Sequence, residues 1–242
     1  MPLPRTSAAR LSETSLAERL PESYLNWPYL VTNRERVFSW QYRYAKRFLD
    51  LAGSVGMICV FAVPGLMIAA AILLSSGGPL FYREERIGRN GNPFRIWKFR
   101  TMYCDSALRG FRVYETKAGS SLHSRVYKTR NDPRVTRLGR FLRQWSLDET
   151  PQVFNILAGE MSLVGPRPIV SDEAPRYGEQ LRFYLMAKPG LSGLWQVSGR
   201  CTVDYAERAR LDAIYVRHWN IISDIQILLR TIPAVLCRVG AW

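Results

Sequence analysis

The chain has 242 residues, of which 47% are hydrophobic and 22% charged, and its formal net charge is +14. This length can bury a core in one or two domains, and the apolar and aromatic content excludes global disorder. The excess of Lys and Arg predicts an anionic partner: nucleic acid, an acidic membrane surface or phosphorylated substrates.

Few residues of the chain are suited to bind a transition metal. There are only two histidines, and the four cysteines are widely separated with no C-x-x-C pair: Cys59, Cys104, Cys201 and Cys237. This pattern argues against a zinc site and favours free thiols in a reducing compartment. Mg²⁺ bound by carboxylate and phosphate oxygens is compatible with the composition.

Residues 1–41 are polar and are interrupted by four prolines. No apolar run precedes a small-residue cleavage site, so the segment does not have the pattern of a secretory signal. We expect a partly ordered arm with a short helix near residues 12–20.

Residues 51–74 form an apolar run without a charged side chain. As a helix rising about 1.5 Å per residue, the run could cross a bilayer core of about 30 Å. Pro64 interrupts it, and basic residues stand on both flanks: Arg43, Lys46 and Arg47 before it, and Arg83, Arg86 and Arg89 after it. A simple span should carry its Lys and Arg excess on one side. We therefore expect a hairpin that turns at Val63 and Pro64, with a proline-kinked spanning helix as the alternative.

A β-hairpin is predicted next. Residues 79–82 are extended and apolar, Asn90 and Gly91 are a favoured turn pair, and residues 94–102 alternate in polarity. On the second strand Lys98 and Arg100 share one face. A half-buried strand with a solvated basic face is the simpler interpretation of the residues alone.

Residues 138–168 read LGRFLRQWSLDETPQVFNILAGEMSLVGPRP, and they begin within a basic amphipathic helix predicted at residues 135–143. Asp148 and Glu149 lie at the centre, Arg143 precedes Asp148 by five residues, and Arg167 follows. A carboxylate pair among arginines suits chemistry on a phosphate, because one acid can attack or hold a metal while the cations bind the anionic substrate.

Helix capping is the alternative role for these carboxylates. Ser146 to Glu149 has the S-x-x-E form of a capping box. With Ser146 as N-cap, however, Pro151 would fall at the fifth helical position and disturb the first intrahelical bond. A later start would place both carboxylates at a helix N-terminus, where the dipole would lower their pKa values and attract a phosphate. The pattern alone leaves capping and catalysis open.

The remaining segments are less specific. A helix over residues 152–159 should end at Gly159, and a strand over 162–164 should lead into a loop in which Pro166 and Pro168 stiffen the backbone around Arg167. A glycine-rich loop over residues 188–200 ends at Arg200 and could wrap a phosphate, although its spacing fits no Walker loop. Two helices are predicted at 203–219 and 221–236, the second interfacial or packed.

Several of these segments together resemble one protein family. The runs SLDETPQVFNILAGEMSLVGPRP, RIGRNGNPFRIWKFRTM, DYAERARLDAIYVRHW and DIQILLRTIPAVL are similar to those of the bacterial sugar transferases, which are small monotopic phosphoglycosyl transferases. The resemblance covers about residue 42 to the C-terminus and keeps the family's motif order. The C-terminal motifs resemble the subgroup that starts exopolysaccharide or O-antigen repeat units.

The resemblance implies an α+β, mostly helical monotopic membrane protein. Its parts would be an arm at 1–41, a re-entrant helix–break–helix hairpin at 42–78, and a cytoplasmic catalytic domain with interfacial helices at 79–242. Lys46, Arg47 and Asp50 match the family's entry motif, which implies charges at headgroup depth. Val63 stands where the family usually has Ser before the proline.

The implied reaction moves hexose 1-phosphate from a UDP-hexose, with glucose or galactose as the sugar, onto undecaprenyl phosphate and releases UMP at the cytoplasmic face of the bacterial inner membrane. Asp148 would be the nucleophile and, with the diphosphate, a ligand of Mg²⁺, while Glu149 would support the metal or move a proton. Substrate binding would fall to a wider set: Lys98, Arg100, Arg143, Pro166, Arg167, Pro168 and Arg200. Membrane lipids are expected partners, nucleic acid is not, and homo-oligomerisation is left open.

Two alternatives differ in class. One is a glycosyltransferase that releases UDP. The other is a non-catalytic basic protein that binds a membrane or nucleic acid, for which residues 95–100 offer cations interleaved with aromatic side chains.

Overall fold

The computed structural model describes residues 40–104, 132–198 and 204–237. The chain divides into two units, residues 1–32 and 33–242, and every described residue belongs to the second. The predicted arm at 1–41, but for its last two residues, and the short helix at 12–20 therefore lie outside the described residues.

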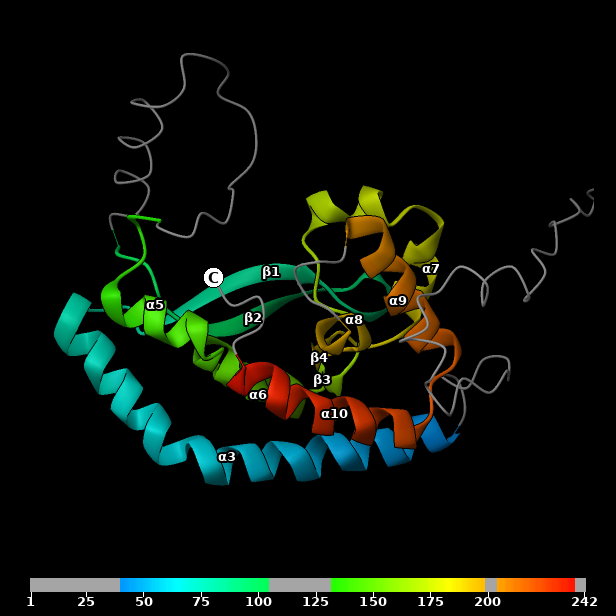
Figure 1. The fold of residues 1–242 in the computed structure, drawn as a ribbon, viewed down its shortest axis with the longest axis horizontal. Coiled ribbons are helices and arrows are strands. Elements are labelled where there is room, and N and C mark those ends of the chain that lie inside the picture. The colour runs from blue at the N-terminus through cyan, green and yellow to red at the C-terminus, as the bar shows by residue number, and fades with distance from the viewer. Residues whose placement is uncertain (1–39, 105–131, 199–203, 238–242) are drawn as a thin grey trace, which may run out of the picture. The chain divides into compact units, whose positions relative to one another are not determined.

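The described residues are mostly helical and contain two small two-stranded sheets, which confirms the α+β class (Figure 1). The elements follow in this order: α3 (Trp40–Ser76), β1 (Phe81–Ile87), the 3₁₀ helix η2 (Arg89–Gly91), β2 (Pro93–Phe99), α5 (Arg137–Gln144), the 3₁₀ helix η3 (Leu147–Gln152), α6 (Val153–Ala158), β3 (Ser162–Val164), the 3₁₀ helix η4 (Ser171–Gln180), α7 (Leu181–Met186), β4 (Gly190–Ser192), α8 (Leu194–Val197), α9 (Tyr205–Arg217) and α10 (Ile221–Leu236).

The apolar segment forms α3, a single α-helix of 37 residues with Pro64 inside it. The ribbon changes direction along its length but remains helical (Figure 1). The predicted interruption at Val63 and Pro64 therefore does not form, and a bent helix takes its place. A proline inside a helix removes one hydrogen bond and tilts the axis, while the bonds on either side can continue.

Helix α3 leaves most of its apolar surface uncovered by the protein. Its Tyr42–Ser76 stretch is long and apolar enough to cross a membrane, and only 6% of its most apolar window is buried. The large exposed side chains include Phe48, Val60, Val63, Leu66, Met67 and Leu74. An apolar surface of this size in contact with water is unfavourable, so it requires an apolar environment.

The two ends of α3 are held by different parts of the protein. Near its C-terminal end, Ile72 is buried against Phe99 of β2 and Leu142 of α5. Near its N-terminal end, Lys46 is buried and its Nζ donates to the Val164 carbonyl at 2.8 Å and pairs with Asp224 of α10 at 2.7 Å. The partners of Lys46 are therefore groups of the protein, and the expectation that this residue lies at headgroup depth stays a prediction.

The neighbouring residues of the predicted entry motif also bind the protein interior. Arg47 donates to the carbonyls of Ile156 and Leu157 at the end of α6, both at 2.7 Å. Asp50 accepts from the Ser162 hydroxyl at 2.7 Å and from the Leu163 amide at 2.9 Å. The motif thus fastens α3 to α6 and β3, because charged side chains at the start of an apolar helix find their partners in the adjoining fold.

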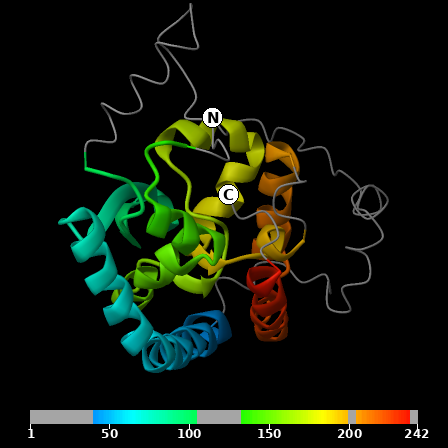
Figure 2. The same ribbon diagram turned by 60° about the vertical axis from the view of Figure 1, so that its left-hand side comes forward.

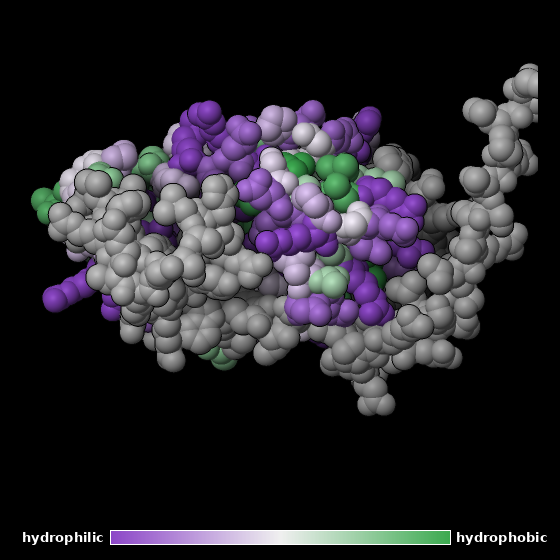
Figure 3. All heavy atoms as spheres, turned by 90° about the horizontal axis from the view of Figure 1, so that it is seen from above, coloured by the Kyte–Doolittle hydropathy of each residue, from purple (hydrophilic) through white to green (hydrophobic). Residues whose placement is uncertain are grey.

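Helix α10 occupies the bounds predicted for it and lies along the first part of α3 (Figures 1 and 2). One face of α10 packs inward through Ser223, Asp224 and Ile227. The other face is apolar and between 44% and 62% exposed: Ile222, Ile225, Leu229, Ile232 and Leu236. Seen from the side away from α3, the described surface is mainly hydrophilic (Figure 3). The exposed apolar side chains of α10 and of α3 therefore belong to neighbouring helices.

The predicted hairpin is confirmed. β1 and β2 pair antiparallel, with Tyr82 opposite Lys98 and Arg86 opposite Phe94. Asn90 adopts a φ of 59° and Gly91 a φ of 80°, the left-handed conformations that this residue pair favours in a tight turn. The helix over α5 and the strand β3 are confirmed as well, and Gly159 ends α6 with a φ of 82°.

Removing the partner of the buried ammonium should unfold the protein more readily than removing a half-exposed partner. We expect Asp224→Ala to lower the free energy of unfolding by about 3–5 kcal/mol, because Lys46 would keep a buried, uncompensated charge. Glu207→Gln, which breaks the partly exposed pair with Arg210, should cost less than about 1 kcal/mol. Denaturant unfolding in detergent micelles measures both, and equal losses would contradict the role given to Lys46.

Candidate active site

Asp148 and Glu149 lie in the first turn of the 3₁₀ helix η3, which ends where α6 begins. Ser146 precedes it in the left-handed conformation, with a φ of 55°, and makes no side-chain capping bond. The capping box is therefore absent. Pro151 is accommodated because a short 3₁₀ helix continuing into α6 replaces a regular α-helical start.

Cations approach the carboxylate pair from two elements. Lys98 of β2 donates from Nζ to Glu149 Oε1 at 2.8 Å. Arg143, in the last turn of α5, is electrostatically coupled to Asp148 and is held by a 2.9 Å bond from its Nε to the Thr101 hydroxyl. The structure therefore brings together four of the predicted site residues: Lys98, Arg143, Asp148 and Glu149.

Burial first, and the charge of Glu149 second, raise the pKa of Asp148 to about 6, although Lys98 and Arg143 act in the opposite direction. The prediction that a helix start would lower this pKa is wrong for Asp148. Desolvation and the adjacent carboxylate outweigh the dipole at the start of the six-residue helix η3. Asp148 is thus an acid that changes charge close to neutral pH, a common property of catalytic groups.

A shallow cavity that is open to solvent lies beside the pair. Its lining combines charged, amide and apolar groups from the hairpin, from η3 and from the loops around β4: Arg86, Ile96, Lys98, Glu149, Gln152, Arg167, Pro168, Gly190, Leu191 and Gln196. Asp148 does not line the cavity, although its neighbour Glu149 does. The predicted residues Lys98, Glu149, Arg167 and Pro168 therefore share one hollow.

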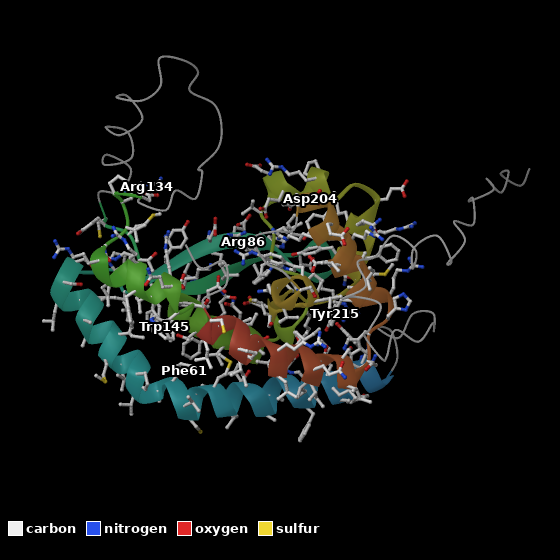
Figure 4. The ribbon with its side chains drawn as sticks, viewed as in Figure 1. Phe61, Arg86, Arg134, Trp145, Asp204 and Tyr215 are labelled. Atoms are coloured by element: carbon white, nitrogen blue, oxygen red, sulfur yellow. The ribbon has the colours of Figure 1, made fainter. Side chains whose placement is uncertain are left out.

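Arg86, Gln152 and Gln196 are cavity residues that the sequence did not identify. The sequence places Arg86 only in the basic flank of the apolar run. In the structure it lies toward the end of β1 (Figure 4), and its guanidinium donates to the Pro168 carbonyl at 3.2 Å. The hairpin register could have revealed it, because Arg86 shares a sheet face with Lys98. Gln196 lies within the predicted glycine-rich loop over residues 188–200, whereas Gln152 has no comparable signal in the sequence.

Arg167 is presented by a close crossing of two backbones. β3 and β4 pair in parallel, and the Gly190 amide donates to the Pro166 carbonyl at 2.7 Å. A Cβ on Gly165 or Gly190 would collide with backbone atoms of the facing segment, so both positions require glycine. The sequence Gly165-Pro166-Arg167-Pro168 is therefore fixed from both sides at the edge of the cavity.

Three described residues that were predicted to bind the substrate do not line this cavity: Arg100, Arg143 and Pro166. Arg100 is buried, and its guanidinium donates to the carbonyls of Ser76, Gly77 and Gly78 at the end of α3. It caps the helix C-terminus, where carbonyls without intrahelical partners attract cations. Arg200 lies outside the described residues.

The site combines an acidic pair, cations and a cavity, and it can be compared with known proteins. The family model for the bacterial sugar transferases matches residues 41–238.

The chain belongs to the bacterial sugar transferase family.

Several relatives of this chain have names that refer to sugar transfer or exopolysaccharide production. An undecaprenyl-phosphate galactose phosphotransferase of Salmonella typhimurium is 46% identical over 83% of this chain and 42% of its own length. The exopolysaccharide production protein ExoY of Rhizobium meliloti is 46% identical over 82% of this chain and 88% of its own length. A UDP-glucose:undecaprenyl-phosphate glucose-1-phosphate transferase of Caulobacter vibrioides is 38% identical over 81% of this chain and 72% of its own length.

This bacterial sugar transferase thus matches less than half the length of the Salmonella relative, and most of the ExoY protein. The resemblance inferred from the dispersed motifs is confirmed as family membership.

The raised pKa of Asp148 has a measurable consequence for stability. Folded Asp148 holds its proton more tightly than an unfolded aspartate, whose pKa is about 3.9, so its contribution to stability is lost as the pH rises from about 4 to about 6. Without divalent cations, Asp148→Asn should therefore unfold a few degrees higher than the unaltered protein at pH 7.5, and the difference should shrink toward pH 4.

Asp132→Asn is the matched control for this measurement. A side-chain hydrogen bond from Arg134 lowers the pKa of Asp132, so its contribution to stability is present at neutral pH and is lost as the pH falls. Thermal unfolding at pH 4.5, 6 and 7.5 should shift in opposite directions for the two variants. An Asp148→Asn protein that is less stable than the parent at pH 7.5 would contradict the assignment.

Proposed function

We propose that this protein transfers a hexose 1-phosphate from a UDP-hexose to undecaprenyl phosphate and releases UMP. The observation that carries the proposal is the pairing of Asp148 and Glu149 with Lys98 and Arg143 beside a cavity that Arg167 and Pro168 also line. The names of the Salmonella and Caulobacter relatives supply the sugar, the phosphate and the lipid of the same reaction.

Asp148 is the proposed nucleophile in a two-step transfer. A carboxylate oxygen attacks the phosphorus that bears the sugar, and the bond from this phosphorus to the bridging oxygen breaks as UMP leaves with the electron pair. An oxygen of undecaprenyl phosphate then attacks the same phosphorus. The bond to Asp148 breaks, which restores the carboxylate and yields hexosyl-diphospho-undecaprenol. With a pKa of about 6, Asp148 is mainly ionised at neutral pH and is more basic than an ordinary aspartate.

The surrounding residues have distinct tasks in this scheme. Lys98 and Arg143 would neutralise charge on the sugar-bearing phosphate, since both act electrostatically on Asp148. Glu149, held by Lys98, is placed to move a proton or to steady the charge of the leaving group. Arg167 would bind the nucleotide end of the donor, and Arg200 remains a further candidate for phosphate.

The residues fit Mg²⁺ as a cofactor bridged by the substrate. Within the described part of the chain no group of three or more His, Cys, Asp or Glu side chains could hold a metal ion, so a site made of protein alone is not available there. Mg²⁺ commonly uses one or two carboxylates and completes its shell with phosphate oxygens and water. Asp148, with Glu149 adjacent, would supply the carboxylates, and the bound ion would neutralise the diphosphate.

We also propose that α3 is re-entrant and that both of its ends lie at the cytoplasmic face of the bacterial inner membrane. The support comes from basic flanks on both sides, from the bend in α3, and from the exposed apolar face of α10 alongside it. A helix and a neighbouring amphipathic helix can then share one leaflet, with the carboxylate pair above the membrane surface.

The topology can be tested with single cysteines. The two substitutions Tyr44→Cys and Ser75→Cys are introduced one at a time into a variant that lacks the natural cysteines. In intact spheroplasts, each new cysteine should react with a membrane-permeant thiol reagent. Neither should react with an impermeant reagent that is applied from outside. Both should react with the impermeant reagent in inside-out vesicles. Labelling of exactly one of the two positions from outside would indicate a spanning helix.

The chemistry can be tested with Asp148→Asn. This variant should lose at least about 10³-fold of the turnover, because an amide cannot form the acyl phosphate, and it should remain in the membrane fraction. Without acceptor lipid, ³²P-labelled UDP-hexose should leave label on the unaltered protein and none on the variant. Normal turnover by Asp148→Asn would remove the nucleophile assignment, and absence of a labelled protein during active turnover would favour direct transfer.

The released nucleotide decides between this reaction and its main alternative. Membranes supplied with undecaprenyl phosphate and a panel of UDP-sugars should release UMP with one hexose preferred. Release of UDP would instead identify a conventional glycosyltransferase.

A further inference from the structure

A second group of cations lies behind Arg167, which lines the cavity, whereas Trp195 and Arg208 do not line it. The Arg208 guanidinium of α9 lies 4.9 Å from the centre of the Trp195 ring, and that of Arg167 lies 5.8 Å from it. Trp195 belongs to α8, next to the cavity residue Gln196. Arg208 also lies 5.0 Å from the Tyr205 ring. We call Arg167, Trp195 and Arg208 the arginine–tryptophan cluster.

Several hydrogen-bond donors of this cluster are unused. Nε and Nη2 of Arg208 and Nε1 of Trp195 are closed to solvent and have no hydrogen-bond partner among the described residues. Buried donors without acceptors are unfavourable, and native proteins keep few of them. All three atoms are donors, so a group rich in acceptor oxygens would satisfy them.

The positive charge of the cluster is only partly balanced. Neither Arg167 nor Arg208 forms an ion pair with a carboxylate among the described residues. Asp212, one turn after Arg208 on α9, is buried and its Oδ2 accepts from the Tyr177 hydroxyl at 2.9 Å. Burial raises the pKa of Asp212 to about 7, so near neutral pH this acid carries only part of a charge. Two guanidiniums on one indole ring therefore favour an added anion.

The cluster is separate from the cations that surround the nucleophile. Lys98 and Arg143 act on Asp148, whereas neither Arg167 nor Arg208 is among the main charges that shift its pKa. Lys98 and Arg167 both line the cavity, so they border one hollow from two sides. If the sugar-bearing phosphate lies by Asp148, the other phosphate of a nucleoside diphosphate lies toward Arg167.

We propose that the arginine–tryptophan cluster binds the phosphate that leaves with the nucleoside, with Arg208 and the Trp195 N–H as its additional ligands. The inference rests on the proposed function for the identity of that phosphate. Arginine and indole N–H groups would each donate to phosphate oxygens, and Arg167 would add its charge from the stiff proline loop. The cluster would hold UMP against dissociation while the acceptor lipid attacks.

Binding of UMP to full-length protein in detergent micelles, measured by calorimetry, tests this assignment. Arg208→Gln should weaken UMP binding about tenfold or more, and Trp195→Phe, which keeps an aromatic ring but lacks the N–H, several-fold. Arg217→Gln is the matched control, because Arg217 is an exposed arginine on the same helix, and it should stay within twofold. Thermal unfolding of each variant establishes that it is folded.

Folded Arg208→Gln and Trp195→Phe proteins that bind UMP as tightly as the parent would overturn the proposal. If Arg208→Gln does not fold, Trp195→Phe decides alone. Loss of affinity for undecaprenyl phosphate in mixed micelles, with UMP affinity kept, would assign the cluster to the lipid phosphate and overturn the nucleotide assignment. Release of UDP by the unaltered protein would contradict the proposed function and not the cluster. In that case, UDP binding by the same variants would test whether the cluster binds phosphate.

Discussion

The buried ammonium of Lys46 holds three parts of this structure in one arrangement. Its Nζ contacts the Val164 carbonyl at the end of β3, the Tyr215 hydroxyl of α9 and the Asp224 carboxylate of α10. A charge without water needs all of these partners, so the three elements cannot shift independently. Because Val164 leads directly into Gly165-Pro166-Arg167-Pro168, the same contact fixes the loop that carries Arg167. The apolar helix is thereby tied to the proposed catalytic surface.

Much of the fold follows from local patterns in the sequence. Alternating polarity and Asn90-Gly91 predict the hairpin, and the apolar spacing predicts α5, α9 and α10. The sequence does not predict that Lys46 is buried, because its partner Asp224 is 178 residues away. The same holds for Arg100, whose acceptors are carbonyls at the end of α3 and carry no residue-specific signal. Long-range partners, rather than local propensity, decide where these cations lie.

The sequence predicted the residues of the candidate site better than it predicted their protonation. Asp148, Glu149, Lys98 and Arg143 gather as the resemblance implies, but the resemblance does not give the raised pKa of Asp148. A carboxyl close to solvent and near two cations would ionise readily. Here burial and the adjacent Glu149 oppose these cations, and a backbone built from a 3₁₀ turn keeps the two acids together. The resulting acid is poorly stabilised in its charged form, which favours the proposed nucleophilic role and makes this part of the fold less stable.

The proposed division of labour between two cationic groups resolves a difficulty in phosphate transfer at a membrane. A single cluster that bound both phosphates of the donor equally would stabilise the ground state as much as the transition state and would not accelerate the reaction. With Lys98 and Arg143 at the attacked phosphorus and Arg167, Trp195 and Arg208 at the leaving group, charge that develops on the departing phosphate meets donors that otherwise lack acceptors. Those donors gain most when the bridging bond has broken. The cost of keeping them unpaired in the free protein is then recovered at the step where it lowers the barrier.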